Sequence, residues 1–157
     1  DRPAGIAPRY GDLAGAARRR CRPPGRNGEL QDLDVGARIL GHASHAHAPS
    51  LFPTAPVPAA RKLLDRLGWD KNDVDLWEVN EAFAVVPMAF MQEMGLSRDK
   101  VNVNGGACAL GHPIGASGAR ILVTLIHALH LRGLSRGVAS LCLGGGEAVA
   151  MAVEMEY

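Results

Sequence analysis

Three side chains with acid–base or hydrogen-bonding chemistry follow apolar stretches of this sequence. Asn80 follows the apolar run 74–79, His112 lies in a glycine-rich loop at 104–115, and Cys142 lies just before three glycines. An amide, an imidazole and a thiol at one site would supply an oxyanion donor, a base and a nucleophile or acid. Together these residue types predict thiol-based acyl chemistry.

Taken singly, each of the three residues has an ordinary structural explanation. An asparagine after a strand commonly caps a helix, and Asn80 would cap one over 81–94. A free cysteine such as Cys142 often packs in a core. A histidine in a glycine-rich loop is harder to explain by packing, because imidazole titrates near neutral pH. The combination, in loops that leave successive strands, favours a shared site.

Hydrophobic periodicity predicts an α/β fold. The expected strands are 37–43, 74–79, 101–103, 137–143 and 148–155, and the expected helices are 57–67, 81–94 and 119–131. This alternation favours a layered domain with a mixed, mostly parallel sheet covered by helices, in which the last two strands form an antiparallel pair. A proline-rich loop is expected around 49–58, and Pro87 is expected to kink its helix.

Composition and charge limit the function further. The chain of 157 residues is the size of one domain, and its net charge of +1 gives no general reason to expect nucleic acid or a membrane as partner. Residues 1–34 differ, because they are rich in Arg, Pro and Gly and lack an apolar period, so we predict an irregular segment there and a folded domain at 35–157. With no signal-like apolar core and unpaired thiols, a cytoplasmic protein is expected.

Three sequence blocks, taken in order, resemble the signature blocks of thiolases. They are N-E-A-F at 80–83, N-V-N-G-G-A-C-A-L-G-H-P-I-G-A-S-G-A-R at 102–120 and C-L-G-G-G at 142–146, within a resemblance that runs from about residue 37 to residue 154. Blocks this long and correctly ordered are specific. The resemblance implies a thiolase-like fold and an acetyl-CoA C-acetyltransferase, which performs Claisen condensation or thiolytic cleavage of 3-ketoacyl-CoA.

The resemblance also implies a role for each residue. His112 would remove the proton of a nucleophilic cysteine, and Cys142 would exchange the α-proton of the second acyl-CoA. Asn80 would hold a water that forms an oxyanion hole with His112, and the backbone N–H of Gly144 would contribute to a second hole.

By the same resemblance, Ala82 and Phe83 would contact the acyl group. No cofactor or metal is implied beyond coenzyme A thioesters, which are substrates. The expected partners are acyl-CoA molecules, with no nucleic acid and no membrane, and the full-length family member is expected to be a homo-oligomer.

The family's nucleophilic cysteine lies in a first half that has no counterpart in this sequence. Neither Cys21 nor Cys108 has a matching context, so we expect the chain to be inactive alone, with Cys108 a packed neighbour of the site. The arginine-rich composition stops where the resemblance begins. This suggests the hypothesis that residues 1–34 are not native thiolase sequence, as in a truncated or misread gene product.

Other functions are weighed against this interpretation. A ketoacyl synthase would share the fold and the Gly-His loop but not Cys142 or the 80–83 block. A degenerate chain could bind coenzyme A esters or pair with a full thiolase subunit, and the arginine-rich start could contact nucleic acid, although the net charge argues against this. His42, His45 and His47 lack a nearby acidic or thiol ligand, so we expect a substrate-side loop rather than a metal site.

Overall fold

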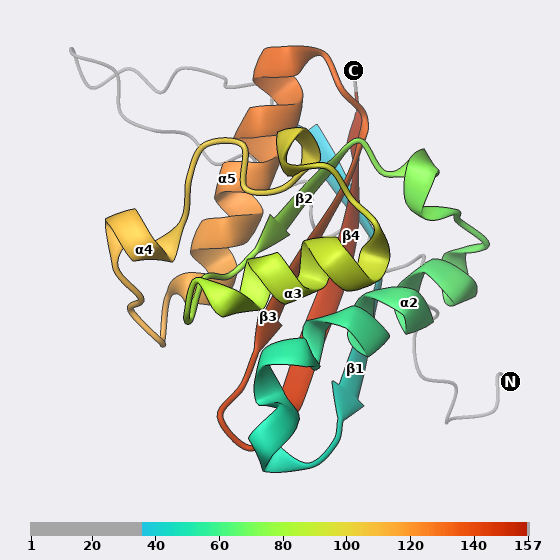
Figure 1. Ribbon diagram of the computed structural model, residues 1–157. Helices are drawn as coiled ribbons and strands as arrows, with labels where there is room; N and C mark the ends of the chain where they lie inside the picture. Colours follow the sequence, from blue (N-terminus) through green and yellow to red (C-terminus); the bar gives the residue numbers. More distant parts are fainter. Residues whose placement is uncertain (1–35, 157) are drawn as a thin grey trace, which may run out of the picture.

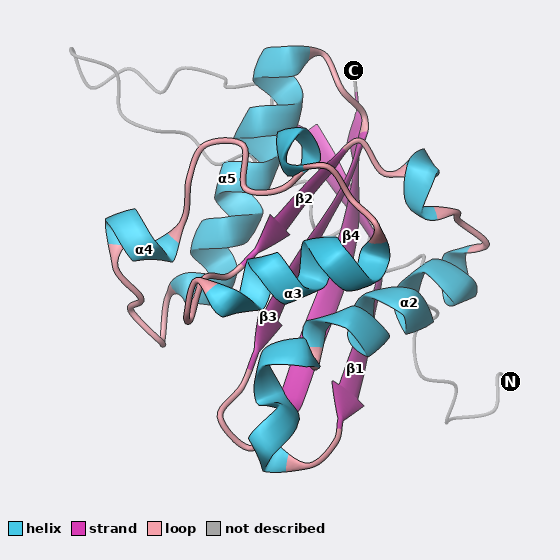
Figure 2. Cartoon of the chain, in the orientation of Figure 1, coloured by secondary structure: helices cyan, strands magenta, loops and turns pink. Residues whose placement is uncertain are grey.

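The computed structural model describes residues 36–156, and the predictions made for 1–34 therefore lie outside the described residues. Figures 1 and 2 show the arrangement of the helices and strands. In chain order the elements are β1 (Gly36–Ala46), η1 (Pro49–Thr54), α2 (Pro56–Leu67), η2 (Lys71–Asp73), β2 (Leu76–Val79), α3 (Val85–Met94), η3 (Arg98–Lys100), α4 (Ala107–Leu110), α5 (Ser117–Arg132), β3 (Arg136–Cys142) and β4 (Glu147–Glu156).

The strands form one sheet in the order β1-β4-β3-β2. β2 pairs with β3 in parallel, whereas β4 is antiparallel to both β3 and β1. β1, β2 and β3 therefore run in one direction, and β4 runs in the opposite direction. The predicted α/β fold with a mixed sheet is confirmed, as is the antiparallel β3–β4 pair. Most of the pairings are nevertheless antiparallel, because the short turn after β3 returns β4 to a place between β3 and β1.

Helices cover both faces of the sheet (Figure 1). α2 and α3 lie on one face, where Leu63 and Phe90 pack with Trp77 of β2 in the larger core cluster. α5 lies on the other face and buries Leu125 and Leu129 against β2, β3 and β4. No helix among residues 36–156 is long and apolar enough to span a membrane.

The helices at 57–67 and 119–131 are found close to their predicted bounds, but three other elements differ. The segment 49–58 is not a plain loop, because it contains η1 and the start of α2. The helix expected from residue 81 begins only at Val85. Pro87 is therefore in its first turn, where a backbone N–H has no partner within the helix, so the proline removes no helical hydrogen bond and requires no kink.

The strand predicted at 101–103 is reduced to single bridges at Val101 and Val103. Between them, Asn102 has φ of 49° and uses its side chain as a substitute for a neighbouring strand. Its Oδ1 accepts the N–H of Val79 at 2.8 Å, and its Nδ2 donates to the Val79 carbonyl at 2.8 Å. The edge of β2 is thus paired by a side-chain amide.

The contact between β3 and α5 depends on a glycine. A Cβ at Gly137 would lie 2.8 Å from the side chain of Leu125, which is fully buried. We predict that Gly137→Ala lowers the free energy of unfolding by about 1 to 3 kcal/mol, because overpacking forces the leucine out of its place. Denaturant titration followed by circular dichroism measures the change.

Gly118→Ala is the matched control. A Cβ at Gly118 would have open space around it, and the residue lies inside α5, where alanine is favoured by up to about 1 kcal/mol. Equal stabilities of the two variants would contradict the packing argument.

Candidate active site

The parallel pairing of β2 and β3 brings Asn80 and Cys142 to the same end of the sheet. Val79 pairs with Ser140, and the backbone N–H of Asn80 donates to the Ser140 carbonyl at 2.9 Å. Cys142 is the last residue of β3. The two side chains therefore occur at neighbouring carboxyl ends of parallel strands, where open α/β sheets place their ligand sites.

Asn80 is buried without being used structurally. Only 1% of the residue is exposed, and neither Oδ1 nor Nδ2 has a hydrogen-bond partner among residues 36–156. α3 begins five residues later, behind Ala84, so the predicted helix-capping role of Asn80 is wrong. A buried amide with both atoms unpaired is destabilising. Its position is suited to binding a water or a substrate oxygen.

Hydrogen bonds to the start of α5 orient the imidazole of His112. The His112 Nδ1 lies 2.6 Å from Oγ of Ser117, and that hydroxyl donates its only proton to the Pro113 carbonyl at 3.1 Å. The oxygen must therefore accept from His112, which places the imidazole proton on Nδ1. Nε2 keeps its lone pair and can act as a base.

The loop that carries His112 is held by α5 as well. Nη1 of Arg120 donates to the Gly111 carbonyl at 2.6 Å, and the backbone N–H of Ser117 donates to the Pro113 carbonyl at 2.9 Å. α5 is sixteen residues long and begins directly after this loop. The partial positive charge of its N-terminus therefore lies beside the loop. The predicted origin of the loop is wrong, because it joins α4 to α5 rather than leaving a strand.

The thiols of Cys142 and Cys108 have different environments. Cys142 is 7% exposed, and burial raises the pKa of its thiol, which keeps it protonated in this chain. Cys108 is exposed, contrary to the prediction that it is packed, because it lies on the first turn of α4. Partial loss of hydration first, and then the hydrogen bond and charge of Glu81, raise the pKa of the Cys108 thiol. Cys21 lies outside the described residues.

The other predicted contacts lie in open surroundings. A Cβ at Gly144 would meet no atom of residues 36–156 within 4 Å, so within this part of the chain a bulky group can approach the backbone. Phe83 is 59% exposed and contacts the ring of Phe52 edge-on at 6.0 Å, whereas Ala82 is partly buried against the larger core cluster. Of these three residues, Phe83 is the one placed to form an apolar wall.

Comparison of the chain with known proteins identifies its family. A model of the thiolase C-terminal domain family matches residues 33–155. The chain belongs to the thiolase family. It is 52% identical to the cytosolic acetyl-CoA acetyltransferase of Mus musculus over 126 residues, which are 80% of this chain and 32% of that protein.

Solved structures support the same relationship. An acetyl-CoA acetyltransferase of Bacillus anthracis superposes with a TM-score of 0.75 at 48% identity, over 83% of this chain and 32% of that one. A thiolase from Ascaris suum in complex with coenzyme A gives a TM-score of 0.73 at 46% identity, over 83% and 33% of the two chains. The chain spans about a third of the length of these relatives.

Glu78 is a buried acidic residue of this thiolase domain that sequence reasoning missed. It is 3% exposed, and Oε1 has no hydrogen-bond partner in the described part of the chain. Burial, and then the charge of Glu81, raise its pKa to about 7, against the opposing effect of Arg120. The available signal was a carboxyl group inside an apolar strand, where charged residues are rarely fully buried.

The histidine cluster of the thiolase domain does not lie in a substrate-side loop. His42 and His45 belong to β1, where residues three apart point to opposite faces, and His47 follows the strand. Among residues 36–156, no group of three or more His, Cys, Asp or Glu could hold a metal ion. The prediction of a loop is wrong because β1 extends three residues beyond its expected end to pair with β4.

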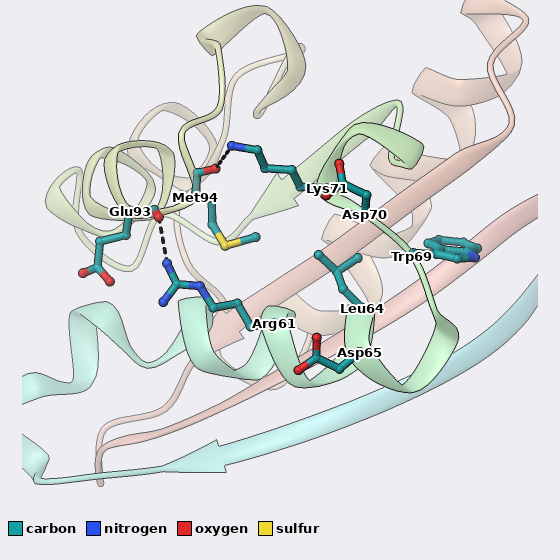
Figure 3. A pocket seen from close by; sticks show the side chains of 8 residues that line it. All are labelled: Arg61, Leu64, Asp65, Trp69, Asp70, Lys71, Glu93 and Met94. Carbon is teal, nitrogen blue, oxygen red and sulfur yellow. Dashed lines mark hydrogen bonds between the residues drawn. The ribbon is translucent and has the colours of Figure 1, made fainter.

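The hollow shown in Figure 3 is lined by side chains that stabilise the end of a helix. It has a volume of about 310 Å³ and lies between α2 and the end of α3. Arg61 donates to the Glu93 carbonyl at 2.8 Å, and Lys71 donates to the Met94 carbonyl at 2.7 Å. Both cations thereby satisfy carbonyls that the end of a helix leaves unpaired. None of the predicted site residues lines this hollow.

The raised pKa of Glu78 predicts a pH-dependent stability. Between the ordinary pKa of 4.5 and about 7, the folded chain keeps a proton that the unfolded chain has lost. Its stabilising contribution is therefore full below pH 4.5 and is lost as the pH rises through 7. From pH 4.5 to 8, the wild type should lose roughly 3 kcal/mol more of its unfolding free energy than Glu78→Gln.

Denaturant unfolding at both pH values measures this difference. Glu93→Gln is the control, because Glu93 is exposed on α3 and its substitution should leave the pH dependence unchanged. A Glu78→Gln variant with the same pH dependence as the wild type would show that Glu78 is already ionised in the folded chain.

Proposed function

We propose that this chain is the C-terminal part of an acetyl-CoA C-acetyltransferase and carries half of its active site. The observation that carries the proposal is the pairing at the ends of β2 and β3: Asn80 offers an unpaired buried amide, and Cys142 ends the neighbouring strand. His112, with Nε2 free to accept a proton, supplies the base. The sequence blocks that contain them belong to the matched family domain.

Each group has a defined task in the proposed reaction. Nε2 of His112 accepts the thiol proton of a nucleophilic cysteine, which then attacks the 3-keto carbon. When the bond between the α-carbon and that carbon breaks, the thiol of Cys142 gives its proton to the α-carbon of the leaving acetyl-CoA. His112, once protonated, and the water bound by Asn80 form one oxyanion hole, and the backbone N–H of Gly144 contributes to the second. The two holes stabilise the charge on the former 3-keto oxygen and on the enolate of the leaving acetyl-CoA. The thiol of coenzyme A then gives its proton to Cys142 and takes the acyl group, and the released cysteine thiolate recovers its proton from His112. Coenzyme A thioesters are the substrates, and no further cofactor takes part.

The nucleophile must come from another polypeptide segment, and we assign it to the N-terminal half of a thiolase. Neither Cys108 nor Cys142 has an environment that would lower its thiol pKa. On the sheet face that α5 covers, two apolar side chains of the described strands stay exposed beside the helix. There Ile39 and Val149 are 47% and 40% exposed, which suits an apolar partner.

Reconstitution of the two halves tests this proposal. The chain is mixed with the N-terminal segment of the mouse cytosolic acetyl-CoA acetyltransferase that the match does not reach, and thiolysis of acetoacetyl-CoA is followed. We expect no turnover by the chain alone and turnover by the mixture. Cys142→Ala and His112→Ala should each lower kcat at least about 100-fold, because each removes a proton-transfer group.

A matched histidine variant serves as the control. His127→Ala removes an exposed imidazole far along α5 from His112 and should leave turnover unchanged. Turnover by the chain alone would overturn the half-site assignment. Binding of acetyl-CoA by the mixture without any turnover would favour the non-catalytic, ester-binding alternative.

A further inference from the structure

A single carboxylate joins the end of β2 to the loop that leads to His112. Oε2 of Glu81 accepts the backbone N–H of Cys108 at 2.9 Å. Oε1 of the same group accepts Nδ2 of Asn102 at 3.1 Å. Asn102 is also the residue whose side chain pairs the edge of β2 through Val79, so the carboxylate connects both ends of segment 102–108.

The carboxylate of Glu81 packs directly against the backbone of Gly106. A Cβ added there would lie 2.7 Å from both carboxylate oxygens of Glu81. The backbone of Gly106 has a negative φ of −156°, which other residues also adopt, so torsion is not the reason for a glycine here. The close approach of Glu81 is the reason.

Only a carboxylate fits both donors. Each of its oxygens faces an N–H group, from Asn102 and from Cys108, and an ionised carboxylate has acceptors alone. A glutamine at position 81 would turn an NH₂ group toward one of these donors. An aspartate would be one methylene too short to reach the same two groups.

The anchored segment continues directly to His112. The N–H of Cys108 lies in the first turn of α4, where a helix leaves its donors unpaired, and Glu81 satisfies it. α4 ends at Leu110, and the next carbonyl, of Gly111, accepts from Arg120. His112 is thus held from the β2 side through Glu81 and α4, and from the α5 side through its own bond to Ser117.

We propose that Glu81 is a positioning residue that fixes the His112 loop relative to Asn80 for the proposed acyl transfer. Glu81 follows Asn80 directly in the chain. The residue that offers the amide is therefore next to the residue that holds the loop of the base, His112. Glu81 itself takes no part in the chemistry. This inference rests on the proposed function, but its structural half is testable on the chain alone.

The first arm measures amide hydrogen exchange in the isolated chain. In Glu81→Gln, we expect the amides of 107–112 to exchange at least about tenfold faster, because a charge-assisted hydrogen bond at the start of α4 is lost. Amides of α2 should be unchanged. Gly106→Ala keeps the carboxylate but displaces the loop, and it should speed exchange of the same amides. If Glu81→Gln does not fold, Gly106→Ala alone tests whether this contact holds the loop. Glu93→Gln is the charge-matched control, because Glu93 is exposed on α3.

The second arm measures kinetics in the reconstituted pair. We expect Glu81→Gln to lower kcat about tenfold or more with a nearly unchanged KM for acetoacetyl-CoA, since a misplaced base affects the transition state more than binding. A purely structural role would reduce the amount of active protein, as found by active-site titration, without changing kcat per site.

The two arms separate the two claims. Unchanged exchange at 107–112 in both Glu81→Gln and Gly106→Ala would overturn the positioning role, as would an unchanged kcat per site in an active pair. An inactive wild-type pair would reject the proposed function, and the exchange data would still decide whether Glu81 anchors the loop.

Discussion

The parallel register of β2 on β3 is the constraint on which the candidate site depends. It aligns Val79 with Ser140, so that Asn80 and Cys142 follow at neighbouring strand ends. The other edge of β2 is paired by the side chain of Asn102, which also fixes where the next loop begins. A shift of β2 by one residue would turn Asn80 to the opposite face and separate it from the loop that Glu81 anchors.

Buried polar groups without partners are concentrated around this end of the sheet. Glu78 lies on β2 and Asn80 directly follows it. Both are nearly inaccessible, yet their polar atoms include ones without a partner among residues 36–156. Unpaired buried polar groups weaken a fold, and natural proteins keep them mainly where function requires it. The rest of the sheet offsets this with two well-packed layers of aliphatic side chains.

The hydrophobic pattern of the sequence was sufficient to predict some helices and strands and not others. α2 and α5 were predictable because their apolar residues recur at helical spacing and glycines end them. The strand at 101–103 was not, because Asn102 replaces backbone pairing with a side chain, and nothing local distinguishes such an asparagine. The exposure of Cys108 on α4 and the burial of Glu78 on β2 depend on the tertiary packing, which a local pattern does not describe. The blocks around Asn80, His112 and Cys142 were recognisable, but the hydrogen bonds that orient His112 were not.

The central claim is that this chain contains the base and the second cysteine of an acyl-transfer site whose nucleophile lies on another segment. The most direct measurement is the mass of each polypeptide after the reconstituted pair is treated with acetyl-CoA and quenched in acid. The account predicts one acetyl group on the N-terminal segment and none on this chain. An acetyl group on Cys142, Cys108 or Cys21 of this chain would contradict it.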